Sequence, residues 1–192
     1  MAEVSAGRKL AFIAIDPSIN GTGLAFMTYT GDFKNKHTFK LLSKYTLSLG
    51  RRKSIYLDKF LKKVDVVSLF KHAVDESESN FGSEYDFKWG VLENYSYASV
   101  GHLADLGEMA GLFKYCLYTY KQEPVNCHVI APSSVKKKLT GSGKGDKLAV
   151  QSALRNYIED YDAIIWNSLD ESDACAVGVA HFLTMLEVHY NE

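Results

Sequence analysis

Apolar residues are distributed along the chain with two different periods. Short apolar runs are typical of strands buried on both faces, and such runs occupy 10–15, 24–29, 39–47, 89–92 and 125–130. Apolar residues spaced by three and four positions are typical of amphipathic helices, and this spacing covers 52–76, 102–121, 146–160 and 170–190. The polar segment 76–86 is predicted to be a loop. The order of these elements predicts an α/β fold, with a mixed five-stranded sheet and helices on both faces.

The length and the composition indicate one folded domain. The chain has 192 residues, of which 46% are hydrophobic and 23% are charged, as is typical of a globular protein. We therefore expect a short N-terminal tail at 1–9 and a single domain over 10–192. No apolar run approaches the roughly 20 residues that span a bilayer, and the first residues do not resemble a signal peptide. We expect a cytoplasmic protein that makes no membrane contact.

The three cysteines, Cys116, Cys127 and Cys175, are far apart and form no CxxC pair. This spacing suggests neither a disulfide framework nor a structural zinc site. We expect them to be buried as small apolar side chains in a reducing compartment.

Four acidic residues stand where the predicted elements end or begin. Asp16 follows the first apolar run and Glu93 follows the fourth, and strand ends are a common place for a site in an α/β sheet. Each of these two, taken alone, is explained at least as well as a solvent-facing residue in a turn. Asp170 and Asp173 lie three positions apart at the start of the last helix, so their carboxylates share one helix face. Capping of the helix explains one of them, most simply Asp170, but not both.

Carboxylates that converge repel one another unless a cation lies among them. Oxygen ligands without a paired His or Cys favour Mg²⁺ over zinc, and Mn²⁺ can substitute. Two such ions about 4 Å apart are the usual apparatus for phosphodiester hydrolysis, where they activate water and stabilise the leaving oxygen. If the four acids meet in the fold, they predict a site of this kind.

Four segments in order resemble the motifs of the RuvC-type Holliday-junction resolvases. They are 14–26 (AIDPSINGTGLAF), 91–97 (VLENYSY), 130–151 (IAPSSVKKKLTGSGKGDKLAVQ) and 170–181 (DESDACAVGVAH). Each match is weak alone, but the four together are specific. Ser18 replaces the usual glycine after the Asp-Pro pair, and the stretch before the second motif is longer than in bacterial members and closer to bacteriophage versions. The family belongs to the RNase H-like superfamily, so the resemblance implies an RNase H-like fold.

The resemblance also implies an activity: Mg²⁺-dependent resolution of four-way DNA junctions by a homodimer during recombination or replication, in a bacterial or phage-infected cell. It makes Asp16, Glu93, Asp170 and Asp173 the catalytic metal ligands. It makes Lys147 the active-site lysine, and Lys136 or Lys137 a basic residue near the scissile phosphate. His181 matches the histidine of the last motif, where a structural role is at least as well supported as metal binding. An aromatic residue after the catalytic glutamate enters the junction centre in the family, so Tyr95 or Tyr97 is a candidate for stacking on a base, although ordinary packing explains both equally well.

Positive charge gathers in one segment of a chain whose formal net charge is −1. The basic residues of 131–155 outnumber its single acid, Asp146, and comprise Lys136, Lys137, Lys138, Lys144, Lys147 and Arg155. A basic strip beside a metal site suits a DNA backbone. The glycine-rich loop 140–145 fails the Walker A pattern, because Lys138 stands at the first glycine position and Gly145 replaces the Ser or Thr. We therefore predict DNA contacts from this loop and no nucleotide cofactor.

The helix expected over 102–121 is the candidate for a dimer interface. Its apolar stripe comprises Leu103, Leu106, Ala110, Phe113 and Leu117. Gly107 and Gly111 lie four positions apart, where a partner helix could approach closely. The alternative is that both glycines pack against the sheet of the same chain.

Three other functions fit part of the pattern. Another RNase H-like nuclease, acting on flaps or RNA–DNA hybrids, would use the same acids. A catalytically silent junction-binding module would not need to keep all four of them. The sugar-kinase and actin superfamily also opens with a strand, an Asp and a glycine turn, but it normally needs two such domains and a longer chain.

Overall fold

The computed structural model describes residues 8–18, 20–31, 38–48, 56–94, 103–119 and 126–190. The strands are β1 (Lys9–Asp16), β2 (Thr22–Tyr29), β3 (Phe39–Leu47), β4 (Tyr85–Glu93) and β5 (Asn126–Ile130). The helices are α1 (Tyr56–Phe81), α2 (Leu103–Thr119), α3 (Pro132–Thr140), α4 (Lys147–Leu154) and α5 (Leu169–Tyr190), and a 3-10 turn covers Tyr161–Ala163.

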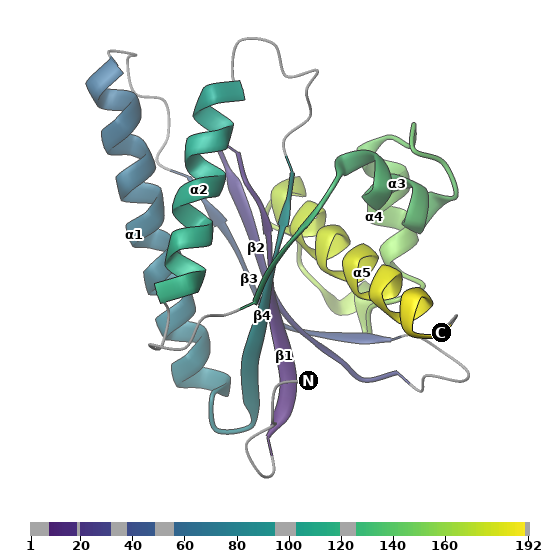
Figure 1. Ribbon diagram of the computed structural model, residues 1–192. Coiled ribbons are helices and arrows are strands. Elements are labelled where there is room, and N and C mark those ends of the chain that lie inside the picture. Colours follow the sequence, from purple (N-terminus) through teal and green to yellow (C-terminus); the bar gives the residue numbers. More distant parts are fainter. Residues whose placement is uncertain are drawn as a thin grey trace.

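The strands form one five-stranded mixed sheet in the order β3-β2-β1-β4-β5 (Figure 1). The first three strands are an antiparallel meander, whereas β4 runs parallel to β1, and β5 runs parallel to β4. Ile15 pairs with Leu92 in the register of β1 and β4. Because these parallel strands end together, Asp16 and Glu93 emerge side by side at one edge of the sheet.

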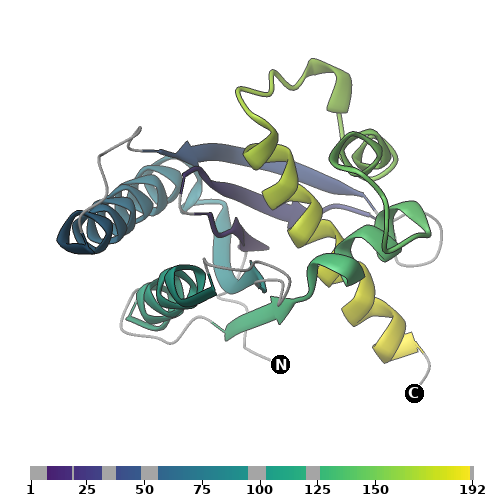
Figure 2. The same ribbon diagram turned by 90° about the horizontal axis from the view of Figure 1, so that it is seen from above.

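Helices cover both faces of the sheet, as the sequence predicts. Alternate side chains of β1 point to opposite faces: Ile13 and Ile15 pack with buried residues of α1 and α2, whereas Phe12 and Ala14 pack with those of α3, α4 and α5. Figure 2 shows α1 and α2 on one side of the sheet, and α5 lying across the other side with α3 and α4. The sheet is therefore buried on both faces, which explains the continuous apolar run of its central strand.

The predicted loop over 76–86 is wrong. Helix α1 continues to Phe81, and β4 begins at Tyr85. Glu76, Ser79 and Glu84 of this stretch are exposed. Ser77, Tyr85 and Asp86 are buried, so the pattern there is amphipathic rather than uniformly solvent-facing. Local polarity alone assigns the polar half of each element to a loop.

The helix predicted over 146–160 is also wrong beyond Leu154, where α4 ends. The chain turns there and passes along the free side of β3. The Phe39 N–H donates to the Tyr157 carbonyl at 2.8 Å, and the Glu159 N–H donates to the Phe39 carbonyl at 2.9 Å. These bonds satisfy part of the outer edge of β3, which sequence periodicity does not reveal.

The apolar stripe of α2 covers its own sheet. Phe113 and Leu117 are fully buried, and Ala110 is nearly so, so most of the stripe assigned to a dimer interface belongs to the core. Gly111 is different, because a Cβ added to it would meet nothing within 4 Å. The alternative in which this glycine packs against the sheet of its own chain is therefore wrong.

The expectation that all three cysteines are buried fails for Cys127, which is exposed on β5, whereas Cys116 and Cys175 are buried. Among the described residues, no helix has the length and hydrophobicity needed to cross a membrane.

Candidate active site

Asp16 and Glu93 form a carboxyl pair at the ends of the two central parallel strands. Burial raises the pKa of Asp16 well above its usual range, and the charges of Glu93 and Asp173 raise it further. The interaction between the two side chains raises the pKa of Asp16 and lowers that of Glu93. Burial also raises the pKa of Glu93. Two buried carboxyl groups that raise or lower each other's pKa in this way are a place where a bound cation would favour their ionised forms.

The first turn of α5 brings two more carboxylates to this pair. Asp16, Asp170 and Asp173 each offer an oxygen, and these atoms lie within 4.8 Å of one another. Burial raises the pKa of Asp170 as well, and the negative charge of Asp173 adds to this effect. The four acids that the sequence singles out therefore meet at one place.

Asp170 is not the cap of α5, contrary to the simplest prediction. The helix begins at Leu169, and the N–H of Glu171 donates to the Ser168 hydroxyl at 3.4 Å. Ser168 therefore caps the helix, which leaves Asp170 available to the site.

The glycines after β1 allow α5 to come this close. A Cβ added to Gly21 would lie 2.5 Å from Oδ2 of Asp170, and one added to Gly23 would overlap the Asp170 carbonyl. Further along α5, a Cβ on Gly178 would lie 2.7 Å from the Phe12 ring. The glycine turn thus has a packing role, since any larger residue would push Asp170 away from Asp16.

The four acids line a cavity of about 370 Å³, together with Lys136 of α3 and Lys147 of α4. The Lys147 ammonium donates to the Asp173 carboxylate. Burial lowers the pKa of Lys147, but this bond and the charges of Asp16 and Asp170 outweigh burial and raise it overall. The charge of Lys136 reaches Glu93, whose pKa it lowers. The cavity is thus acidic at its base and has two ammonium groups on its α3–α4 side.

The other predicted basic residues are not part of this cavity. Lys137 and Lys144 are exposed, the latter in the loop between α3 and α4. The ammonium of Lys138 pairs with Glu187 near the other end of α5. Tyr95 and Tyr97 lie outside the described residues.

His181 does not reach the acids. Its ring lies 4.8 Å from that of His128 on β5, centroid to centroid. Burial and, to a smaller extent, the neighbouring His128 lower the pKa of His181 to about 4. The structure therefore places this histidine in the packing between α5 and β5.

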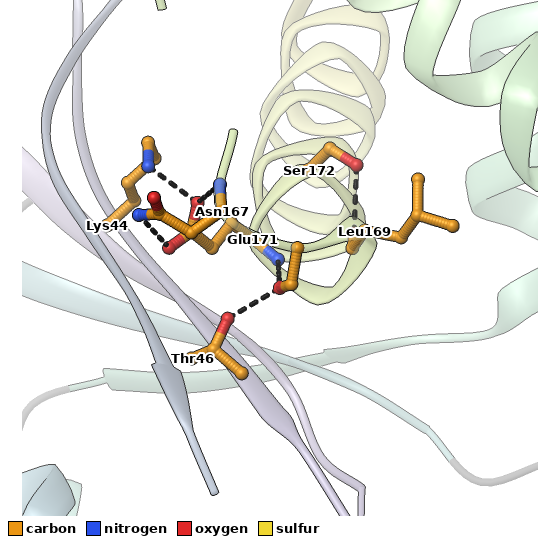
Figure 3. Close-up of polar contacts among 7 residues, drawn as sticks. Lys44, Thr46, Asn167, Leu169, Glu171 and Ser172 are labelled. Atoms are coloured by element: carbon orange, nitrogen blue, oxygen red, sulfur yellow. Dashed lines mark hydrogen bonds and ion pairs between the residues drawn. The ribbon is translucent and has the colours of Figure 1, made fainter. Parts of the chain in front are cut away.

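Glu171 is a charged residue near the site whose role the sequence does not reveal (Figure 3). Its side chain is 2% exposed and pairs at 2.5 Å with Lys44 of β3. The backbone and side-chain amides of Asn167 donate to the same carboxylate, at 2.9 and 3.1 Å. Glu171 stands between the candidate ligands Asp170 and Asp173, so the sequence alone would suggest a further metal ligand. No feature of the sequence near Glu171 identifies Lys44 as its partner.

Three solved structures share this architecture. Thermus thermophilus RuvC matches with a TM-score of 0.67 and 17% identity, over 91% of this chain and 95% of RuvC. T. thermophilus RuvC in complex with a Holliday junction substrate matches with a TM-score of 0.68 and 18% identity, over 92% and 95%. The yeast mitochondrial Holliday junction resolvase matches with a TM-score of 0.59 and 10% identity, over 97% and 86%.

No protein-family model and no curated protein matches the sequence. The likeness therefore lies in the fold, and it extends over nearly the whole of each partner. The chain has the RNase H-like α/β fold of the RuvC-type Holliday junction resolvases.

Proposed function

We propose that this protein is a divalent-metal-dependent endonuclease that resolves four-way DNA junctions. The observation that carries the proposal is the convergence of Asp16, Glu93, Asp170 and Asp173 in one cavity. It is supported by the fold, which is that of RuvC, a protein whose solved structures include a complex with a Holliday junction. Such an enzyme would act in recombination or replication, in the cytoplasm of a bacterial or phage-infected cell.

The donor set fits a hard divalent cation. It consists of carboxylate oxygens, and three of the acids have raised pKa values because they are buried among like charges. Mg²⁺ prefers such ligands, and Mn²⁺ accepts them too. Asp16, Glu93, Asp170 and Asp173 would hold the metal. Two bound ions would supply an activated water and would stabilise the leaving oxygen of the phosphodiester.

Lysines beside the acids would bind the DNA backbone. Lys147 and Lys136 line the cavity, so either ammonium can contact a phosphate that lies over the acids. Lys144, in the exposed loop between α3 and α4, would extend this contact along the strand. The contributions of Lys137, Lys138, Tyr95 and Tyr97 stay predictions.

A homodimer would suit a substrate that is cut on two symmetry-related strands. Support comes from the outer face of α2, where Gly111 is open and Tyr115 and Tyr118 are 64% and 65% exposed. Gly111→Leu should weaken a dimer formed through this face. Light scattering at micromolar concentration would show the loss, and a wild-type monomer with and without junction DNA would contradict the dimer.

The experiment that tests the activity is a panel of substrates in Mg²⁺. It comprises a synthetic four-way junction, a linear duplex, a flap and an RNA–DNA hybrid of matched sequence. We expect cleavage of the junction at symmetry-related positions and at least about tenfold slower cleavage of the others. Preferred cleavage of the flap or the hybrid would assign the chain to another class of RNase H-like nuclease.

A further inference from the structure

The first turn of α5 is fastened to β3 by two neighbouring contacts. Lys44 pairs with Glu171 at 2.5 Å, and the Thr46 hydroxyl hydrogen bonds to the Ser168 hydroxyl at 2.5 Å. Lys44 and Thr46 are two positions apart on the strand, so both point to the face of the sheet that α5 covers. Figure 3 shows the side chains of Lys44 and Thr46 directed from β3 toward the start of the helix.

Both carboxylate oxygens of Glu171 are already engaged by hydrogen bonds from neighbouring residues. One carboxylate oxygen accepts from the Lys44 ammonium and from the Asn167 backbone, and the other accepts from the Asn167 side chain. The carboxylate is also buried on the β3 side of the helix, while Asp170 and Asp173 line the cavity. Its role is therefore to hold the helix and not to bind the metal.

The contacts with β3 oppose a force that the acids create. Carboxylate oxygens of Asp16, Asp170 and Asp173 lie within 4.8 Å of one another, so the negative charges of these side chains repel one another. Without a cation this repulsion favours movement of the first turn of α5 away from β1. The contacts with Lys44 and Thr46 hold the side of that turn that faces β3. The close packing of the Asp170 region against Gly21 and Gly23 limits any other movement of the turn.

We infer that Lys44 and Glu171 are positioning residues that keep Asp170 and Asp173 at metal-binding distance from Asp16 before metal binds. This inference rests on the proposed function, since it takes the four acids to be metal ligands. Partners that orient metal ligands commonly change metal affinity by about 10–100-fold when they are removed. Lys44 and Glu171 would act in this way through the helix backbone.

The test is Mn²⁺ affinity of the DNA-free protein, read from the electron paramagnetic resonance signal of free Mn²⁺. Lys44→Met and Glu171→Gln should each raise the half-saturating Mn²⁺ concentration about tenfold. In cleavage assays the same variants should need more metal but should approach the wild-type rate at saturating metal, because bound metal itself draws the acids together. Thr46→Val should have the same effect to a smaller degree.

Glu187→Gln is the matched control, because it breaks an ion pair between Glu187 and Lys138 at the other end of the same helix. It should leave Mn²⁺ affinity within twofold of wild type. Unchanged affinity in Lys44→Met and Glu171→Gln, or an equal loss in Glu187→Gln, would overturn the inference. If the two buried-pair variants do not fold, Thr46→Val decides, and an unchanged Mn²⁺ affinity in that variant would overturn it. Wild type that binds no Mn²⁺ at millimolar concentration would instead refute the proposed metal site itself.

Discussion

The two ends of α5 carry the same kind of ion pair in opposite surroundings. At the first turn, Glu171 and Lys44 are 2% and 15% exposed, and two metal-ligand candidates flank the glutamate. At the far end, Glu187 and Lys138 are 66% and 20% exposed. The two glutamates are about 24 Å apart along the helix axis, from its rise per residue. An exposed pair of this kind contributes little to stability, whereas a buried acid that loses its partner is costly.

The difference shows how one helix serves both packing and chemistry. Its middle is apolar and small, with Gly178 against Phe12, so α5 lies close to the sheet. This close packing makes the first turn a rigid support for Asp170 and Asp173. The far end of α5 holds none of the candidate ligands, and its Glu187 side chain is exposed. Mutations at the first turn should therefore change metal binding and cleavage, whereas mutations at the far end should leave both nearly unchanged.

The largest effect is expected at the acids themselves. Asp173→Asn and Asp16→Asn should each slow junction cleavage at least ~10³-fold, about 4 kcal/mol of transition-state stabilisation. Junction binding should persist, because the lysines remain. Single-turnover gel assays measure the rate, and Glu187→Gln is the control that should stay within twofold of wild type. A loss below tenfold in both acid variants would break the assignment.

Lys147→Ala should have the next largest effect. The Lys147 ammonium pairs with Asp173 inside the cavity. Its removal should lower the rate at which bound junction is cleaved by ~10²-fold, as expected for the loss of a donor that stabilises developing charge. Lys144→Ala should weaken binding and flatten its salt dependence, because an exposed phosphate contact releases counterions. If Lys147→Ala changed binding alone and left the turnover rate intact, Lys147 would belong with Lys144.

Metal-free stability should respond to the crowding of the acids. A buried carboxyl with a raised pKa binds protons more readily in the folded state than in the unfolded state. The free energy of unfolding therefore falls as pH rises from the unfolded-state pKa through the folded-state pKa. Asp16→Asn removes this cost. In EDTA the variant should melt a few degrees above wild type at pH 8, and the gap should narrow at pH 5. A lower melting temperature of the variant at pH 8 would indicate that Asp16 is structural.

The smallest effect is expected in the outer half of α5. The pKa of His181 is lowered to about 4 in the folded state, against about 6.5 when it is unfolded. The stability linked to its neutral form is present above pH 6.5 and is lost as pH falls toward 4. His181→Leu should therefore lose less stability than wild type between pH 7 and pH 5 in urea melts. Equal losses in both proteins would mean that His181 titrates normally.

The sequence predicts the strands and the acids well, because buried strands and helix-face spacing are local patterns. The places of Asp16, Glu93, Asp170 and Asp173 follow from such patterns, and in the structure all four line one cavity. What the sequence does not predict depends on distant partners. Glu171 accepts a hydrogen bond from Lys44, which is 127 positions away in the sequence. Lys138 donates to Glu187 and does not line the cavity.

The wrong predictions of secondary structure have a related cause. The second half of α1 and the start of β4 each bury a few side chains beneath polar neighbours, and local hydropathy averages these into a loop. The stripe of α2 faces its own sheet, where Leu117 lies so close to Gly90 of β4 that a Cβ there would be 2.5 Å from it. A stripe in the sequence shows that a face is buried but not what buries it.

The most direct test of the account is the metal dependence of junction cleavage by the wild-type protein. A labelled four-way junction is incubated with the protein in EDTA, and then with Mg²⁺ or Mn²⁺ added back, while binding is followed in parallel. The account predicts binding in every condition, and paired incisions near the crossover only when Mg²⁺ or Mn²⁺ is present. Cleavage that persists in EDTA, or bound junction that stays intact in both metals, would contradict it.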